Sequence, residues 1–297
     1  MNQKRWNTLT KFDSIMLGDN PFFGVDHLSY ERGRQRTAQL TFDNAVEVIK
    51  CSYDLGIKDM MVGTRPNLAD LLDNLSKKTD LLEKIQFHPL LPYAQGYVIK
   101  MSEKGMVQTI KEILKLGGIR TDLKILAKGG LGFIRKDLFD LFKVFIDVEL
   151  LQLKNIKIKT IFLHPALTDL TLALGMRGIF ETFKDHLHDH YRIEAGLCTK
   201  NFPRLVDKLT DWNMKISNIM TSFNKVGFLM NPSKEDCERY LESYDGTVTG
   251  MNIFAGGYLG LNEAYNYITS QPKLRNVVIG VSSTEHARET FCLFNSK

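Results

Sequence analysis

The chain has 297 residues, of which 43% are hydrophobic and 25% are charged, so it can bury a large core. Its net charge of +5 is mild and its basic residues are spread among acids, which argues against a nucleic-acid-binding surface and leaves a small preference for anionic partners. The N-terminus lacks the apolar core of a signal peptide, and no apolar run approaches the roughly 20 residues that cross a bilayer, so we expect a cytoplasmic protein without membrane contact.

Short apolar runs of the kind found in buried parallel strands alternate with helix-like stretches along the whole chain. The expected strands are 15–20, 59–64, 85–88, 125–128, 161–164, 192–199, 219–224, 248–255 and 277–283. The expected helices are 42–55, 67–76, 95–116, 137–153, 201–212, 234–244, 260–270 and 284–294. This alternation predicts a (β/α)8 TIM barrel that forms one domain over residues 1–297. Because eight strands close such a barrel, one of the nine is expected to be accessory, either the run at 14–17 or the run at 85–91.

Two strand ends carry side chains suited to catalysis. His164 follows Ile161-Phe162-Leu163, and its imidazole can donate a proton or hydrogen-bond to a carbonyl group; the alternative is a half-buried histidine satisfied by a neighbouring carbonyl. Lys128 follows Ile125-Leu126-Ala127. Partial burial there would lower the pKa of its amine unless the charged amine binds an acidic group, and the alternative is a structural salt bridge.

Other polar residues lie in turns at further strand ends. His88 and Tyr93 flank a proline-rich loop and could line one pocket or simply pack on the rim. Asp19 lies in a loop dense in polar and aromatic groups, which could bind a metal or sugar hydroxyls or form a surface turn. Gly280, Ser282 and Ser283 lead from a strand into a helix, where free N–H groups and hydroxyls favour an anion, although a helix cap alone would show the same residues.

The spacing of the cysteines, histidines and acids along the chain gives little support for a metal site or a reactive thiol. The four cysteines are far apart and form no pair typical of zinc binding, so we expect reduced thiols. No metal-site spacing links Asp19, His88 and His164, and the histidines at 186, 188 and 190 are interpreted as part of an exposed loop. We therefore expect no bound metal.

The C-terminal half resembles the aldo-keto reductase superfamily. The resemblance is carried, in order, by 162–165 with 168–169, by 194–201, by 253–259 and by 278–286, and upstream by 125–129. It implies a barrel enzyme that uses NADPH. Position by position, Lys128 matches the family's active-site lysine and His164 its histidine. Ser282 and Ser283 match the segment that holds the cofactor's 2′-phosphate, and Asn224 matches the polar residue beneath the nicotinamide.

The chain also departs from that family. Where the family has an aspartate and then a proton-donating tyrosine, the sequence reads Met60-Met61-Val62-Gly63-Thr64-Arg65-Pro66-Asn67. Thr290 stands where an asparagine that contacts adenine is usual. These departures weaken the inference of reductase activity more than that of the fold, because a fold does not dictate chemistry.

Three functional hypotheses follow. The first is an NADPH-dependent reductase of a small carbonyl compound, in which His164 orients the carbonyl group, Lys128 lowers the pKa of the proton donor, and that donor is His164 or Tyr93. The second needs no cofactor: a lyase, aldolase or hydrolase of a phosphorylated or anionic substrate, with Lys128 as Schiff-base amine or clamp and His88 and His164 as acid and base. The third is a binding protein without catalysis. In each case the partner is a small molecule, expected to be anionic.

Overall fold

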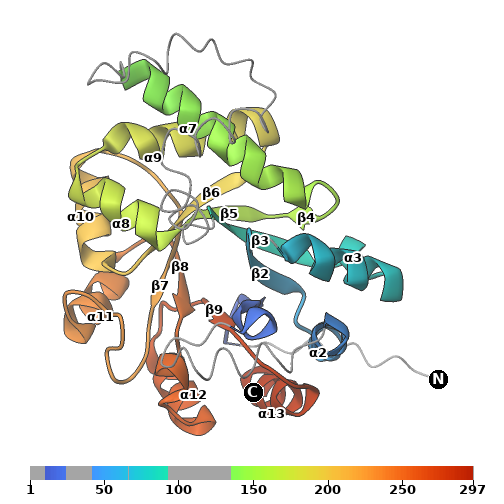
Figure 1. Ribbon diagram of the computed structural model, residues 1–297. Helices are drawn as coiled ribbons and strands as arrows, with labels where there is room; N and C mark the ends of the chain where they lie inside the picture. The colour runs from blue at the N-terminus through green and yellow to red at the C-terminus, as the bar shows by residue number, and fades with distance from the viewer. Residues whose placement is uncertain (1–10, 25–41, 66, 93–134, 297) are drawn as a thin grey trace.

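Eight parallel strands close into a barrel (Figure 1). The computed structural model describes residues 11–24, 42–65, 67–92 and 135–296. The ring runs β2-β1-β9-β8-β7-β6-β5-β3, and β2 pairs with β3 to complete it. The strands are β1 (Ser14–Gly18), β2 (Asp59–Gly63), β3 (Gln86–Leu91), β5 (Thr160–Leu163), β6 (Glu194–Thr199), β7 (Asn218–Ser222), β8 (Thr247–Met251) and β9 (Asn276–Ile279). The predicted (β/α)8 TIM barrel is confirmed.

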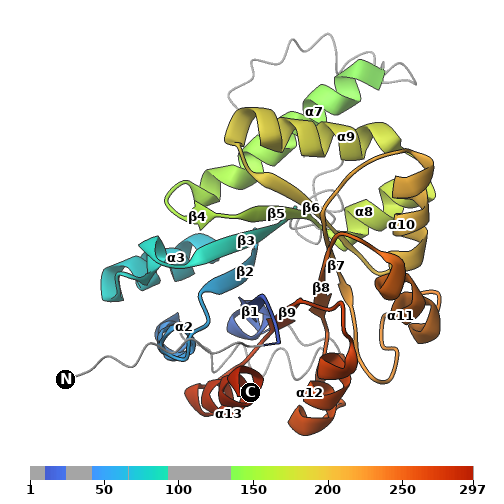
Figure 2. The same cartoon turned by 180° about the vertical axis from the view of Figure 1, so that it is seen from behind.

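Helices surround this barrel on the outside, as the two opposite views show (Figures 1 and 2). They are α2 (Phe42–Asp54), α3 (Leu68–Lys78), α7 (Arg135–Leu150), α8 (Pro165–Ala173), α9 (Arg177–His186), α10 (Phe202–Asp211), α11 (Lys234–Ser243), α12 (Leu261–Ser270) and α13 (Thr284–Asn295). Ser233 and Ser283 accept backbone N–H groups at the starts of α11 and α13, which is the capping expected of serine before an acidic first turn. Within the described residues, none of the helices combines the length and apolar character needed to cross a membrane.

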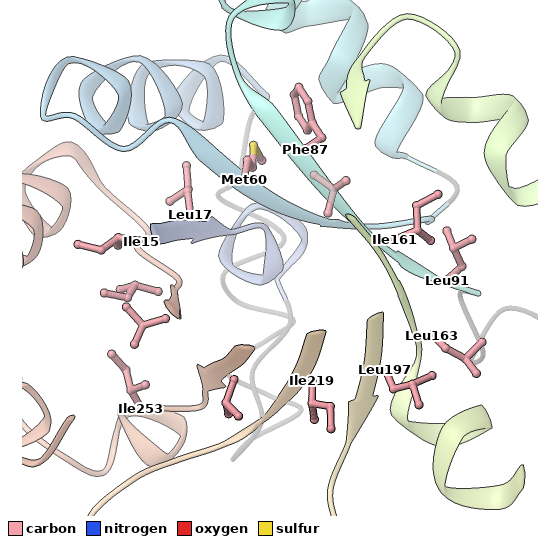
Figure 3. Close-up of a cluster of buried hydrophobic side chains, with 14 of the residues drawn as sticks. Ile15, Leu17, Met60, Phe87, Leu91, Ile161, Leu163, Leu197, Ile219 and Ile253 are labelled. Carbon is pink, nitrogen blue, oxygen red and sulfur yellow. The ribbon is translucent and has the colours of Figure 1, made fainter. Parts of the chain in front are cut away.

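Side chains alternate between two cores because successive strand residues point to opposite faces. Ile161 and Leu163 point outwards and join the large core between the strands and helices, which Figure 3 shows together with residues such as Leu17 and Phe87. Phe162, between them, points into the barrel and packs with Cys198 and Met220 in a separate inner core. Three neighbouring strands, β5, β6 and β7, therefore contribute to both layers, and the interior of the barrel is filled rather than hollow at this level.

Neither of the two strands that were expected to be accessory has that role. Both runs named for that role are barrel strands, β1 and β3, and each pairs on two sides within the ring. The additional strand is β4 (Lys157–Ile158), which pairs only with the beginning of β3. The run expected at 125–128 lies outside the described residues, and the eight described strands close the ring without it.

The histidine-rich segment is helical, not an exposed loop. Helix α9 continues to His186 and is followed by a π-helical turn over Leu187–Tyr191. Phe180, Phe183 and Leu187 are fully buried at helical spacing, which explains why the helix persists through polar residues. His186 is buried and binds Asp147 of α7 at 2.6 Å, so it joins two helices.

Candidate functional site

The carboxyl ends of the eight strands meet at one rim, where barrel enzymes bind their ligands. Asp19 follows β1, Arg65 lies just beyond β2, His164 follows β5 and Lys200 follows β6. In the ring, β1 pairs with β2, β2 and β5 both pair with β3, and β6 pairs with β5, so the ends of β1, β2, β5 and β6 lie along one continuous stretch of the rim. The site is built from these residues.

His164 is held as a neutral hydrogen-bond donor. It is the N-cap of α8, and its Nδ1 accepts the N–H of Ala166 at 3.2 Å. Burial lowers the pKa of His164 to about 4, helped by the positive charges of Lys200 and Arg65. Since the imidazole is neutral and Nδ1 accepts, the proton lies on Nε2. Nε2 makes no hydrogen bond to any residue that the structure describes, so it is free to donate to a ligand.

Arg65 is held over Asp19 by several contacts. Its Nη2 donates to Asn20 Oδ1 at 2.7 Å, its guanidinium lies 4.9 Å from the centre of the Phe23 ring, and its Nε lies 3.5 Å from Asp19 Oδ2. Asp19 Oδ2 accepts the N–H of Gly63 at 2.8 Å. Burial raises the pKa of Asp19, against the opposing influence of the Arg65 charge and the Gly63 N–H. Asp19 is therefore a support beneath Arg65 rather than an exposed ligand.

Asp169 connects α8 to the end of β6. Its carboxylate accepts the Thr199 hydroxyl at 2.5 Å and the backbone N–H of Lys200 at 3.1 Å. Burial raises the pKa of Asp169, while these two donors and the Lys200 charge favour its ionised form. The helix that begins at His164 is thus tied to the residue that carries the Lys200 side chain.

Gly280, Ser282 and Ser283 lie at the same rim, on the opposite side. Three strands lie between them and His164 in either direction, because β9 and β5 are opposite in the ring. Ser283 Oγ accepts the N–H of His286 as a helix cap, so the plain capping alternative holds for this residue. Ser282 Oγ is exposed and lies 3.3 Å from His286 Nδ1. A Cβ on Gly280 would lie 3.0 Å from Pro21, so the glycine lets the loop after β1 pack closely here.

His88 and Asn224 occupy structural positions. His88 is buried inside the barrel, and its Nε2 lies 2.8 Å from Asp59 Oδ1 at the beginning of β2. It points to the amino-terminal half of the barrel and is not brought together with His164. Asn224 is fully buried in the loop after β7, where its amide group both donates to and accepts from the backbone of Phe228. Its role under a nicotinamide stays a prediction.

Lys128 and Tyr93 lie outside the described residues, so their predicted roles stay predictions. Three rim residues were not singled out from the sequence: Arg65, Asp169 and Lys200. Arg65 and Lys200 show the same signal that identified His164, a polar residue within two positions of an apolar strand's carboxyl end. Arg65 lies in the segment that departs from the family's pattern, so the resemblance assigns it no role.

Groups that could ligate a metal do not gather in threes anywhere in the described ranges. All four cysteines are free, and three of them are buried. Burial raises the pKa of Cys198, which faces the inner core, so its thiol is held protonated and unreactive. The described part of the rim therefore offers acid–base and cationic groups.

No protein-family model and no curated protein matches the chain. Solved structures do match. A protein from Pseudomonas aeruginosa described as a candidate aldo-keto reductase is 12% identical with a TM-score of 0.61, covering 96% of this chain and 90% of that one. An aldo-keto reductase from Bacillus halodurans in its holo form is also 12% identical, with a TM-score of 0.54 over 96% and 88% of the two chains.

A glycerol dehydrogenase from Gluconobacter oxydans is 11% identical, with a TM-score of 0.56 over 94% of this chain and 86% of that one. At such identities the likeness establishes the fold alone. The chain has the barrel fold of the aldo-keto reductases, as the sequence resemblance implied.

Proposed function

We propose that this protein is a cytoplasmic oxidoreductase of the aldo-keto reductase type that reduces a small carbonyl compound with NADPH. The observation that carries the proposal is the state of His164: a neutral imidazole at the rim whose Nε2–H is free of partners among the described residues. Such a group can donate a hydrogen bond to a carbonyl oxygen and polarise it, as a neutral histidine at a helix N-terminus does in other barrel enzymes.

The residues opposite His164 fit the cofactor. NADPH is long and ends in a phosphate on its adenosine ribose, so it needs one binding region near the reacting carbonyl and another at a distance. The exposed Ser282 hydroxyl, with His286 beside it at the start of α13, offers donors for a phosphate on the far side of the rim. When bound, NADPH supplies a hydride to the carbonyl carbon and is oxidised to NADP+, while the carbonyl oxygen gains a proton.

The chain's own residues act on the carbonyl oxygen. His164 Nε2–H holds the oxygen in place, and the positive charges of Arg65 and Lys200 favour the negative charge that develops on it. A neutral imidazole holds its Nε2 proton tightly, so His164 is better suited to orient the oxygen than to protonate it. Of the two proton donors named from the sequence, this argument favours Tyr93, with Lys128 lowering its pKa. Both lie outside the described residues.

The test begins with cofactor binding. NADPH is titrated into the protein while tryptophan and nicotinamide fluorescence are recorded, and its oxidation is then followed with a panel of aldehydes and ketones. We expect saturable binding, and turnover that falls about 100-fold or more in His164→Asn while NADPH affinity is retained. Asparagine is the matched replacement because it can still cap α8. Unchanged fluorescence at saturating NADPH would remove the proposal.

A second variant tests the far side of the rim. In Ser282→Ala the helix cap at Ser283 remains, so the start of α13 is preserved. We expect NADPH to bind roughly tenfold more weakly, since one hydrogen bond to a charged group is lost, while NADH binding is unaffected. Equal weakening for both cofactors would show that Ser282 does not contact the 2′-phosphate.

A further inference from the structure

Three basic side chains gather on one side of the rim, more than orienting a carbonyl oxygen requires. Arg65, His164 and Lys200 extend from the ends of β2, β5 and β6. The backbone N–H groups of Thr64 and His164 bind the carbonyls of Leu90 and Leu91, on either side of the end of β3. The N–H of Lys200 binds Asp169 of the helix that begins after His164, so the three residues lie around one stretch of the rim. His164 is neutral, so the two charges on either side of it are those of Arg65 and Lys200, and such neighbouring like charges are stabilised when an anion lies between them. The cluster therefore points to a negatively charged ligand.

The neighbouring acids neutralise this cluster only in part, because Asp19 lies 3.5 Å from Arg65 Nε but Asp169 is engaged elsewhere. Asp19 is buried beneath Arg65 and engaged with the Gly63 N–H, and Asp169 is used by Thr199 and by the backbone of Lys200. The ammonium group of Lys200 has no ion pair among the described residues, and its side chain is exposed. Arg65 Nε is buried without a hydrogen-bond partner there, although it is 3.5 Å from Asp19. The Lys200 ammonium group is therefore the donor that remains for a ligand beside His164, together with the exposed part of Arg65.

Arg65 is also held in place before any ligand binds. Asn20 accepts from one end of its guanidinium and the Phe23 ring lies 4.9 Å from it, so little side-chain freedom remains to be lost on binding. The Arg65 side chain is 14% exposed, so part of it remains accessible to a ligand. A planar guanidinium matches the geometry of a carboxylate.

We propose that the substrate carries a carboxylate next to its carbonyl group, as in a 2-oxo acid, and that Arg65 and Lys200 bind this carboxylate while His164 binds the carbonyl oxygen. This inference rests on the proposed function and names its substrate class. One small molecule then satisfies all three basic groups, because the carboxylate and the carbonyl oxygen of a 2-oxo acid are separated by a single carbon–carbon bond. Arg65 and Lys200 are specificity-determining residues in this arrangement.

The experiment compares phenylglyoxylate with its methyl ester, which has the same ketone without the negative charge. Direct binding of each compound is measured by calorimetry without cofactor, and NADPH-dependent reduction is measured separately. In Lys200→Met we expect phenylglyoxylate affinity and kcat/KM to fall about tenfold, and in Arg65→Met about 100-fold, mainly through KM. For the ester, both quantities should change less than about threefold. Arg65→Lys should have a phenylglyoxylate affinity and kcat/KM between those of wild type and Arg65→Met, because lysine keeps the positive charge but lacks the paired N–H donors of a guanidinium.

Controls separate the possible failures. Lys208→Met removes the same charge from a half-buried lysine of α10 that pairs with Asp211, and it should leave both compounds unaffected. If Arg65→Met does not fold, the exposed Lys200 still tests the proposal. Carboxylate binding that is lost in the variants, without reduction of either compound, would overturn the proposed function but support the anion site. Equal loss for acid and ester, or no loss, would overturn the anion site. Preference for dihydroxyacetone phosphate over phenylglyoxylate would overturn the choice of carboxylate.

Discussion

His164 shows how one residue's chemistry is set by its neighbours. It is a helix cap, so its Nδ1 is committed to Ala166, and two cations nearby oppose a second proton. A histidine of ordinary pKa would be partly charged at neutral pH and would bind an anion by itself. Here the imidazole is a neutral donor, and the charge is supplied by Arg65 and Lys200 instead.

The lowered pKa of His164 predicts a loss of stability in acid. Its pKa of about 4 in the folded state is below the 6.5 of a free imidazole, so the unfolded chain binds the proton first as the pH falls. This group adds nothing above about pH 6.5 and destabilises the folded state progressively down to about pH 4. We expect a loss of about 2 kcal/mol between about pH 7 and pH 4.5 from this residue, since it is not fully buried.

Guanidinium unfolding of wild type and His164→Asn at those two pH values measures this effect. The variant has no group that titrates at this position, so its stability should fall by about 2 kcal/mol less than that of the wild type. Parallel losses in the two proteins would show that the imidazole is not held neutral by its surroundings.

The junction between α8 and β6 is the element that positions the site. Asp169 lies on the first turns of α8 and accepts from the two residues at the end of β6, so the helix and the strand are tied at the rim. This contact includes the backbone N–H of Lys200, so it also fixes the start of the Lys200 side chain. The sequence alone indicated neither the helix that carries Asp169 nor the strand that its carboxylate reaches.

Replacing Asp169 tests this tie. Asp169→Ala leaves the buried Thr199 hydroxyl and the Lys200 N–H without their acceptor, which should cost about 1–3 kcal/mol in unfolding free energy. Asp169→Asn keeps an acceptor oxygen and should cost less. Thermal and chemical unfolding of both variants provide the measurement, and equal effects from alanine and asparagine would mean that the hydrogen bonds contribute little.

Much of the element pattern could be predicted because it depends on local signals. Alternating apolar runs located all eight barrel strands, and serine caps located the starts of α11 and α13. Helices α8 and α9 were missed: α8 starts with a proline directly after the strand, and α9 is followed by a π-helical turn rich in histidine. The accessory strand β4 has two residues, too few for any periodic pattern.

The site was predicted only in part, for a different reason. His164 was found because one residue at one strand end carries the signal. Arg65 and Lys200 matter through their joint effect on His164, and that depends on β2, β5 and β6 being close in the ring, which only the strand order reveals. His88 was interpreted as a rim residue because its strand's inward and outward faces cannot be told apart in a run that is apolar throughout.

At the scale of the whole molecule, the barrel separates stability from chemistry. Asp59 and His88 pair inside its amino-terminal half, with Lys159 3.7 Å from Asp59. Burial alone would raise the pKa of Asp59, but His88 and Lys159 outweigh it and lower that pKa. The pair's contribution is therefore present above the carboxyl's usual pKa and is lost as the pH falls through the lowered value.

Breaking this pair should affect folding but not the reaction. Asp59→Ala leaves the buried imidazole of His88 unpaired and should cost about 2–4 kcal/mol, and Asp59→Ala with His88→Leu should recover part of that loss. Unfolding measurements give the free energies. At a temperature where Asp59→Ala is folded, its kcat should match that of the wild type, and a large drop in kcat would place the pair in the reaction after all.

The inner core of Phe162, Cys198 and Met220 limits how small molecules enter and leave the barrel. These side chains obstruct the barrel axis below the rim, so a molecule bound there has no passage to the opposite face. Under the proposed function, reactant, product and nicotinamide would all enter and leave through one opening. Whichever of them is deepest can leave only after the others have moved aside, which makes an obligatory order of association and release the natural kinetic scheme for such an enzyme.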